Sequence, residues 1–295
     1  MKILLLGANG QVGFELARSL APLSELRTPT RDEVDLANRD SLGGALETNP
    51  DIVVNAAAYT AVDRAEDEPE LADRINHDAL VVLGDWAKRR DALVVHYSTD
   101  YVFDGAAMRP YREEDPTAPL GAYGRTKLAG EHALRASGCR YLIFRTAWVY
   151  AARGHNFLRT MLRIGRERDA VRVVDDQHGA PTTARLIADV TANVLTRLAE
   201  RPRPAFGTYH LAAGGGCTWF EYARAIFARA QAAGLIDRHV EVMPIATADY
   251  PTKARRPAYS VLDTTKLRET FGIHLPPWGD GTDAVIAELA AQRNG

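Results

Sequence analysis

Short, uninterrupted apolar runs alternate with segments of helical periodicity through the first half of this chain. Apolar runs cover residues 2–6, 51–55, 92–97 and 141–145, a short second strand is expected at 26–29, and helical spacing extends over 14–20 and 69–90. Strands buried on both faces of a parallel sheet have this continuous apolar character. The alternation therefore predicts an α/β fold built on a doubly wound parallel sheet.

The alternation loosens after residue 150. We expect a first domain over residues 1–150, to which part of 165–200 returns, and a smaller α/β lobe formed mainly by 151–295. Residues 201–204 (Arg-Pro-Arg-Pro) are predicted to form a short stiff connector. Further helices are expected at 155–168, 184–198, 218–232, 264–271 and 279–292, and a strand at 170–174.

The first strand runs directly into the pattern Gly7-x-x-Gly10-x-x-Gly13, which opens a helix. Gly7 permits a tight turn, Gly10 lets a phosphate approach backbone N–H groups, and Gly13 lets the helix pack against the strand. A helix N-terminus here would face a pyrophosphate. Three glycines alone could be a plain turn, but this position favours a Rossmann-type dinucleotide site. Its predicted cofactor contacts are Gly7, Asn9, Gly10, Gln11 and Val12.

The next strands add candidate contacts to the rest of the dinucleotide. Arg31 follows the second strand and could pair with the 2′-phosphate of NADPH, whereas Asp35 could accept the free 2′-hydroxyl of NADH. NADPH is therefore expected, with NADH left open. Leu36, next to Asp35, is a further predicted cofactor contact. Small side chains after the third strand leave room for the nucleotide, and they belong to Ala56, Ala57 and Ala58.

Tyr123 and Lys127 are four residues apart on a predicted helix and therefore share one face. An ammonium beside a phenol favours the phenolate, so we expect Lys127 to lower the pKa of Tyr123 toward the working range. Thr99 follows the fourth strand and could donate a hydrogen bond to a carbonyl group. A phenol and an ammonium so placed indicate acid–base chemistry beside a reducible group.

Composition excludes several classes of function. A formal net charge of −2 gives no sign of a nucleic-acid-binding surface. Cys139 and Cys217 are too few for a disulfide framework or a metal cluster, and the eight histidines have no metal-ligand spacing. Ser98 lacks a nucleophile elbow, and His96 is read as a packed or hydrogen-bonded residue. Without a leader or a membrane span, the chain is expected to be cytoplasmic.

The glycine pattern, Thr99 and the Tyr123–Lys127 pair together resemble the extended short-chain dehydrogenase/reductases. Longer stretches resemble the dTDP-4-dehydrorhamnose reductase family within that superfamily, nearly from end to end. These stretches are residues 54–63, 96–103, 123–131, 145–150, 176–182 and 256–263.

The resemblance implies reduction of dTDP-4-dehydro-L-rhamnose at C4 by hydride from the nicotinamide. In that family tyrosine is the catalytic acid, lysine binds the nicotinamide ribose and tunes the tyrosine, and serine or threonine binds the reacting oxygen. Those roles fall to Tyr123, Lys127 and Thr99. The expected substrate contacts are Thr60, Val62, Thr99, Asp100, Tyr123, Trp148 and Arg256.

Other readings stay open. A 4,6-dehydratase of the superfamily would carry a glutamate after Thr99-Asp100, where this chain has Tyr101. An epimerase uses the same Tyr/Lys pair, and a non-catalytic regulatory subunit shares the fold. Consumption of the reduced cofactor with the keto sugar separates the reductase from both.

One departure from the family concerns Mg²⁺, which some members bind between subunits through glutamates. Glu15 and Glu288 fall at matching positions, but Arg185 replaces a third glutamate, and its charge would repel a cation. We therefore expect no metal, and a monomer or a weak homodimer.

Overall fold

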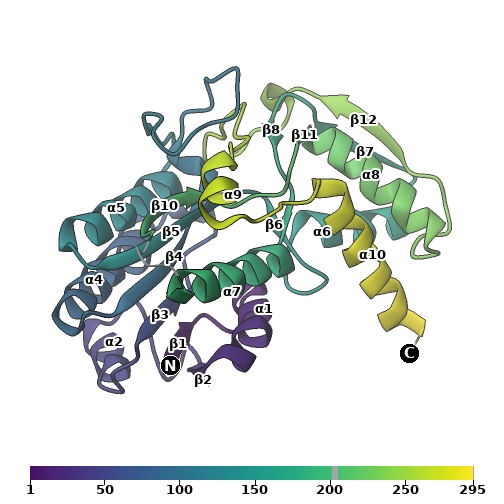
Figure 1. Ribbon diagram of the computed structural model, residues 1–295. Coiled ribbons are helices and arrows are strands. Elements are labelled where there is room, and N and C mark those ends of the chain that lie inside the picture. The colour runs from purple at the N-terminus through teal and green to yellow at the C-terminus, as the bar shows by residue number, and fades with distance from the viewer. Residues whose placement is uncertain (201–204, 295) are drawn as a thin grey trace.

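The computed structural model describes residues 1–200 and 205–294. The predicted connector at 201–204 lies outside the described residues. Figure 1 shows two parts: a central sheet flanked by helices, and a smaller group of helices and short strands beside it. No helix among the described residues is long and apolar enough to cross a membrane.

Six parallel strands form the central sheet, in the order β10-β5-β4-β3-β1-β2. Strands β1, β3 and β4 are almost wholly buried, as their apolar sequences predict. Their bounds are β1 Lys2–Leu6, β2 Glu25–Arg27, β3 Ile52–Asn55, β4 Leu93–Thr99, β5 Arg140–Thr146 and β10 Gly207–His210.

Helices cover both faces of this sheet, and each face has its own apolar core. On one face α1 packs beside α7, and on the other α4 packs beside α5. The doubly wound parallel sheet is thereby confirmed. The helices are α1 Gln11–Leu20, α2 Arg39–Leu46, α3 Pro69–Asp73, α4 Ala79–Arg90, α5 Ala122–Ser137, α7 Ala184–Glu200 and α9 Thr265–Phe271.

Single turns of 3₁₀-helix lie between several of these elements, and a π-helical turn joins α3 to α4. The 3₁₀ turns are η1 Ala21–Leu23, η2 Arg64–Glu66, η4 Asp100–Val102 and η5 Thr247–Asp249, and the π turn is η3 Arg74–Asp78.

The remaining elements pack around a third apolar core. Strands β7 and β12 pair in parallel, while β6–β9 and β8–β11 form two further short pairs. The bounds are β6 Val149–Tyr150, α6 Phe157–Glu167, β7 Ala170–Val174, β8 His178–Gly179, β9 Thr182–Thr183, β11 Cys217–Thr218, α8 Trp219–Ala232, β12 Glu241–Ile245 and α10 Trp278–Asn294.

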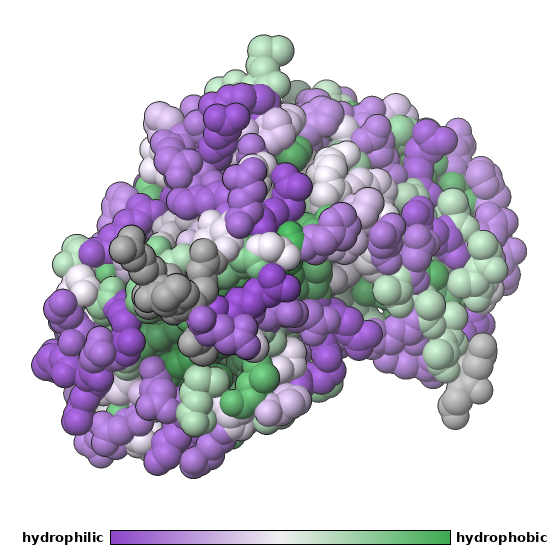
Figure 2. Space-filling view, in the orientation of Figure 1, coloured by the Kyte–Doolittle hydropathy of each residue, from purple (hydrophilic) through white to green (hydrophobic). Residues whose placement is uncertain are grey.

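The chain crosses between the two parts more than once. Helix α7 packs on α1, and β10 forms an edge of the central sheet although it follows residue 200. The division into residues 1–150 and 151–295, with part of 165–200 returning, stays a prediction. On the face in Figure 2, hydrophilic side chains predominate and hydrophobic ones lie in patches between them.

Two elements differ from the sequence prediction. The helix expected over 69–90 is interrupted by the π turn η3, where Asn76 turns inward and bonds both backbone polar groups of Tyr59 and the Thr126 hydroxyl. Strand β4 runs to Thr99 rather than ending at residue 97. Its ladder with β5 continues to the pair Thr99–Thr146, so both hydroxyl residues belong to the sheet.

Helix α5 approaches the π turn so closely that only glycine fits at the contact. A Cβ on Gly130 would lie 2.2 Å from the carbonyl oxygen of Asn76. In Gly130→Ala that clash must displace α5, and we expect a loss of about 1–3 kcal/mol in the free energy of unfolding. Urea denaturation measures it.

Gly43→Ala in α2 is the matched control, because nothing lies within 4 Å of an added Cβ there. It should gain about 0.5–1 kcal/mol through helix propensity. Equal stability of the two variants would contradict the close packing of α5.

Candidate active site

A cavity of about 690 Å³ opens at the carboxyl edge of β1, β3, β4 and β5. Parallel α/β sheets bind ligands at this edge, where the strand order reverses between β1 and β3. Every candidate named from the sequence lines the cavity: Gly7, Asn9, Gly10, Gln11, Val12, Arg31, Asp35, Leu36, Ala56, Ala57, Ala58, Thr60, Val62, Thr99, Asp100, Tyr123, Lys127, Trp148 and Arg256. Which of them contact a ligand stays a prediction.

The glycine turn is shaped by backbone contacts that exclude side chains. Gly7 has φ +81°, and its carbonyl accepts a hydrogen bond from Gly10 N at 3.0 Å. A Cβ on Gly13 would lie 2.0 Å from that same carbonyl oxygen. Gly10 is the N-cap of α1 and offers no side-chain cap, so N–H groups of the first helical turn are left for an anion.

The two residues expected to decide between NADPH and NADH, Arg31 and Asp35, both line the cavity. Arg31 is exposed, and the carboxylate of Asp35 accepts a hydrogen bond from Ala37 N at 3.0 Å. That bond leaves acceptor capacity on the carboxylate. The geometry therefore keeps both cofactors possible.

Helix α5 begins where Glu66 holds it. The Glu66 carboxylate accepts a hydrogen bond from Ala122 N at 2.7 Å, at the first residue of the helix. Two residues on, Gly124 packs against the segment after β4, since a Cβ there would lie 2.3 Å from Tyr101 O. These two contacts place Tyr123, between them in sequence, at the cavity.

Tyr123 and Thr99 line the cavity together, and the Thr99 hydroxyl donates a hydrogen bond to Asp100 at 3.0 Å. Burial raises the pKa of Tyr123 above its ordinary value, the nearby Thr99 hydroxyl opposes the rise, and the charge of Asp100 adds to it. The expected lowering by Lys127 is therefore wrong for the protein without ligands. A raised pKa keeps the phenol protonated at neutral pH, which is the state a proton donor needs.

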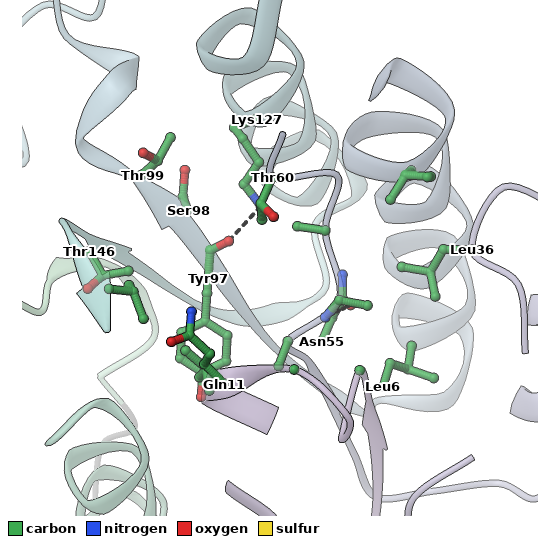
Figure 3. A pocket seen from close by; sticks show the side chains of 18 of the residues that line it. Leu6, Gln11, Leu36, Asn55, Thr60, Tyr97, Ser98, Thr99, Lys127 and Thr146 are labelled. Atoms are coloured by element: carbon green, nitrogen blue, oxygen red, sulfur yellow. Dashed lines mark hydrogen bonds between the residues drawn. The ribbon is translucent and has the colours of Figure 1, made fainter. Parts of the chain in front are cut away.

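Lys127 is buried, and its ammonium points at the Tyr97 carbonyl of β4 (Figure 3). Nζ donates to Tyr97 O at 2.7 Å and lies 3.1 Å from His96 Nε2. Burial lowers the pKa of Lys127 to about 7, and the carboxylate of Glu131 opposes that change. Glu131 is itself bound by Arg145 at 2.9 and 2.7 Å.

Asp100 and Thr146 are two further buried polar residues that line the cavity. Burial raises the pKa of Asp100 to about 6, against the hydrogen bond that it accepts from Thr99. Thr146 is buried at the end of β5, and within the described part of the chain its hydroxyl oxygen has no hydrogen-bond partner. Because buried hydroxyls are rarely left unpaired, Thr146 is suited to a bound molecule.

Aromatic side chains from the second half of the chain form the opposite wall. Trp148 has φ +46°, rare for a residue with a side chain, and its ring stacks on Trp219 with centroids 3.4 Å apart. The ring centroids of Phe157 and Trp219 are 4.6 Å apart. A Cβ on Gly179 would lie 2.3 Å from the Trp148 indole, so glycine is required behind it. Trp148 is thus a cavity residue.

Arg256, in the segment between η5 and α9, also lines the cavity. Its guanidinium donates to Asp63 at 2.8 Å and to the Tyr101 hydroxyl at 3.3 Å. Tyr101 in turn lies edge-on to Tyr123, with ring centroids 5.7 Å apart. Asp63 therefore holds the Arg256 guanidinium beside the Tyr101 phenol, which packs against Tyr123.

Sequence reasoning missed several residues of the wall. Those at strand ends adjoin named candidates, so position alone could have found them, whereas Phe157 and Trp219 come from distant helices and gave no such signal. The missed residues are Leu6, Ala8, Pro29, Thr30, Val34, Asn55, Ile75, Tyr97, Ser98, Tyr101, Thr146, Val149, His155, Phe157 and Trp219.

A metal does not fit between Glu15 and Glu288. The guanidinium of Arg185 lies between the two carboxylates, at 3.4 Å from Glu15 and 3.9 Å from Glu288. Arg18 also pairs with Glu15, at 3.0 Å. These arginines supply the positive charge that Mg²⁺ would bring.

The sheet, the glycine turn and the Tyr123–Lys127 helix define a short-chain dehydrogenase/reductase. The family model described as "RmlD substrate binding domain" matches residues 1–291, so the chain belongs to that family.

Several of its relatives are dTDP-4-dehydrorhamnose reductases. A dTDP-4-dehydrorhamnose reductase of Burkholderia thailandensis is 51% identical over 99% of this chain and 100% of its own. One of Salmonella typhimurium is 46% identical over 98% of each chain. A crystal structure of a dTDP-4-dehydrorhamnose reductase of Bacillus anthracis in complex with NADP has a TM-score of 0.89, with 34% identity over 97% of this chain and 99% of the other.

The position of Arg185 predicts how the protein responds to Mg²⁺. We expect no stoichiometric binding in a calorimetric titration of metal-free protein, because both carboxylates already face a guanidinium. Arg185→Ala, which removes that charge, should bind Mg²⁺ more tightly than the unaltered protein. Stoichiometric Mg²⁺ binding by the unaltered protein, lost in Glu15→Gln, would contradict this expectation.

Proposed function

We propose that this protein reduces the C4 keto group of dTDP-4-dehydro-L-rhamnose to give dTDP-L-rhamnose, with NADPH as the expected reductant. The observation that carries the proposal is that Tyr123 and Thr99 line the same cavity as the glycine turn. A proton donor, a hydroxyl for the reacting oxygen and a phosphate-binding turn thus open on one space.

The residues of the cavity fit a dinucleotide. First-turn N–H groups of α1 receive the pyrophosphate, Ala56–Ala58 leave space along the edge, and Arg31 meets the adenosine end. NADPH supplies the hydride that reduces the sugar. Lys127 binds the ribose next to the nicotinamide, where one ammonium proton remains after its two contacts on β4.

Tyr123 and Thr99 act on the oxygen of the keto group. Thr99 holds the oxygen in place and stabilises negative charge as it develops there. As C4 accepts the hydride, Tyr123 gives its proton to the oxygen, so that the ketone becomes an alcohol and the phenolate recovers a proton from solvent. The raised pKa of Tyr123 keeps its proton in place until this step.

The sugar lies between the aromatic wall and the segment around residue 60. Trp148 offers an apolar surface to the deoxysugar, with Thr60, Val62 and Asp100 facing it across the cavity. Arg256, held by Asp63, binds the diphosphate of the substrate through its remaining N–H groups. What supports these roles is that all five residues line the same cavity.

Tyr123→Phe tests the proton donor. Because the ring is kept and the hydroxyl is lost, we expect kcat to fall by about 10²-fold or more, while cofactor affinity stays nearly unchanged. Oxidation of NADPH with the purified keto sugar measures the rate. One mole of NADPH consumed per mole of sugar identifies a reductase; turnover without consumption would identify an epimerase, and no turnover by the unaltered protein a regulatory subunit.

Arg256→Ala tests the diphosphate contact. The KM for the dTDP-sugar should rise about 10-fold or more, as expected for a lost charged hydrogen bond, with a smaller change for NADPH. Arg255→Ala is the matched control, since this neighbour is exposed and does not line the cavity. If both variants keep the original KM, Arg256 does not belong to the site.

A further inference from the structure

His96 is a buried residue that the proposed mechanism leaves without a task. It lies in β4, one residue before Tyr97, and only 1% of its surface is exposed. The sequence indicated a packed or hydrogen-bonded residue here. In the structure its Nε2 lies 3.1 Å from Nζ of Lys127, so it is one of the two groups that hold the catalytic lysine.

The other ring nitrogen leads back to the cofactor edge. His96 Nδ1 lies 3.4 Å from the amide nitrogen of Asn55, at the end of β3. That nitrogen is a donor, because the Asn55 side-chain oxygen accepts from Ala57 N at 3.2 Å. In a neutral ring the contacts with Asn55 and with Lys127 therefore belong to alternative tautomers, and the shorter one, to Lys127, needs Nε2 as the acceptor.

The charge state of His96 suits it to this position. Burial and the nearby charge of Lys127 hold the pKa of His96 well below its usual value, so the ring is neutral. A neutral imidazole has one nitrogen that accepts a hydrogen bond, whereas a protonated ring has none and would repel the ammonium. His96 can therefore hold the Lys127 ammonium without competing for charge.

We propose that His96 is a positioning residue for the reduction: its ring accepts a hydrogen bond from the Lys127 ammonium and keeps that group charged and aimed at the nicotinamide ribose. The inference rests on the proposed function, because it needs Lys127 to bind the cofactor. The bond to Tyr97 O fixes one direction of Nζ, and the bond to His96 fixes a second. With two N–H bonds of the ammonium directed at these acceptors, its third N–H bond can point in only one direction.

The other charged groups around Lys127 do not supply this contact. On its own helix, Glu131 raises the pKa of Lys127 from one turn away, but its carboxylate oxygens are bound by Arg145 from β5 and by Arg135. Tyr123, also on α5, stays protonated because burial raises its pKa, and Asp100 accepts a hydrogen bond from Thr99. Without His96, Nζ would keep only the Tyr97 carbonyl among these contacts.

The test is the pH dependence of NADPH binding, followed by the fluorescence of the bound nicotinamide between pH 6 and 9. The ammonium fraction of the free protein falls as pH rises through about 7, so affinity should fall over the same range. In His96→Leu the ammonium loses an acceptor, so the midpoint should shift downward by roughly half a unit and kcat should fall about 10-fold. Lys127→Met should bind weakly with no such transition.

His96→Asn and His96→Gln make the test independent of whether the leucine variant folds. The glutamine amide can reach Nζ and accept its proton, so His96→Gln should restore much of the midpoint and of kcat. The shorter asparagine cannot reach, and should behave as leucine does. A control is His210→Leu, which removes another buried neutral histidine, on β10 and outside the cavity. It should lower thermal stability and leave the midpoint unchanged.

Each outcome has one meaning. A downward shift in the leucine and asparagine variants with rescue by glutamine supports the proposal. An unchanged midpoint, an upward shift, or an equal shift in His210→Leu overturns it. If Lys127→Met binds NADPH as the unaltered protein does, the failure lies in the proposed role of Lys127 and not in that of His96.

Discussion

The burial of a lysine against a strand is the constraint on which this site depends. Lys127 is covered on α5, and its ammonium can stay there only because a carbonyl and an imidazole of β4 receive it. Burial brings its pKa to about 7, so a ligand that offers oxygen atoms changes the balance between its charged and neutral forms. Strand β4 thus supports the Lys127 side chain and also forms part of the core.

Everything that places α5 accurately serves that contact. Glu66 holds the first turn, and Gly124 and Gly130 let the helix approach the Tyr101 and Asn76 carbonyls more closely than any side chain would allow. The π turn that carries Asn76 reaches across to Tyr59 and Thr126, which joins the loop beside the substrate pocket to the same helix. Close packing of this kind transmits small displacements, so the position of Tyr123 depends on residues well outside the cavity.

The second part of the chain contributes a wall of different chemistry. Trp148, Trp219 and Phe157 are apolar and stacked, whereas Arg256 is held by Asp63 from the first part. Arg185 adds an intramolecular ion pair between α1 and α10, at the position where some relatives were expected to hold a metal.

The sequence by itself determined the sheet and the candidate residues of its edge, because a strand buried on both faces must be apolar and the turn that follows must be glycine-rich. Gly7 and Thr99 were identified in this way, and Tyr123 and Lys127 from their four-residue spacing on a predicted helix. Only the tertiary structure decided that Lys127 faces His96 and Tyr97 instead of Tyr123, and that Trp219 supports Trp148. Those contacts join residues far apart in the chain, and burial, which sets the pKa values of Tyr123 and Lys127, depends on all elements packed around them.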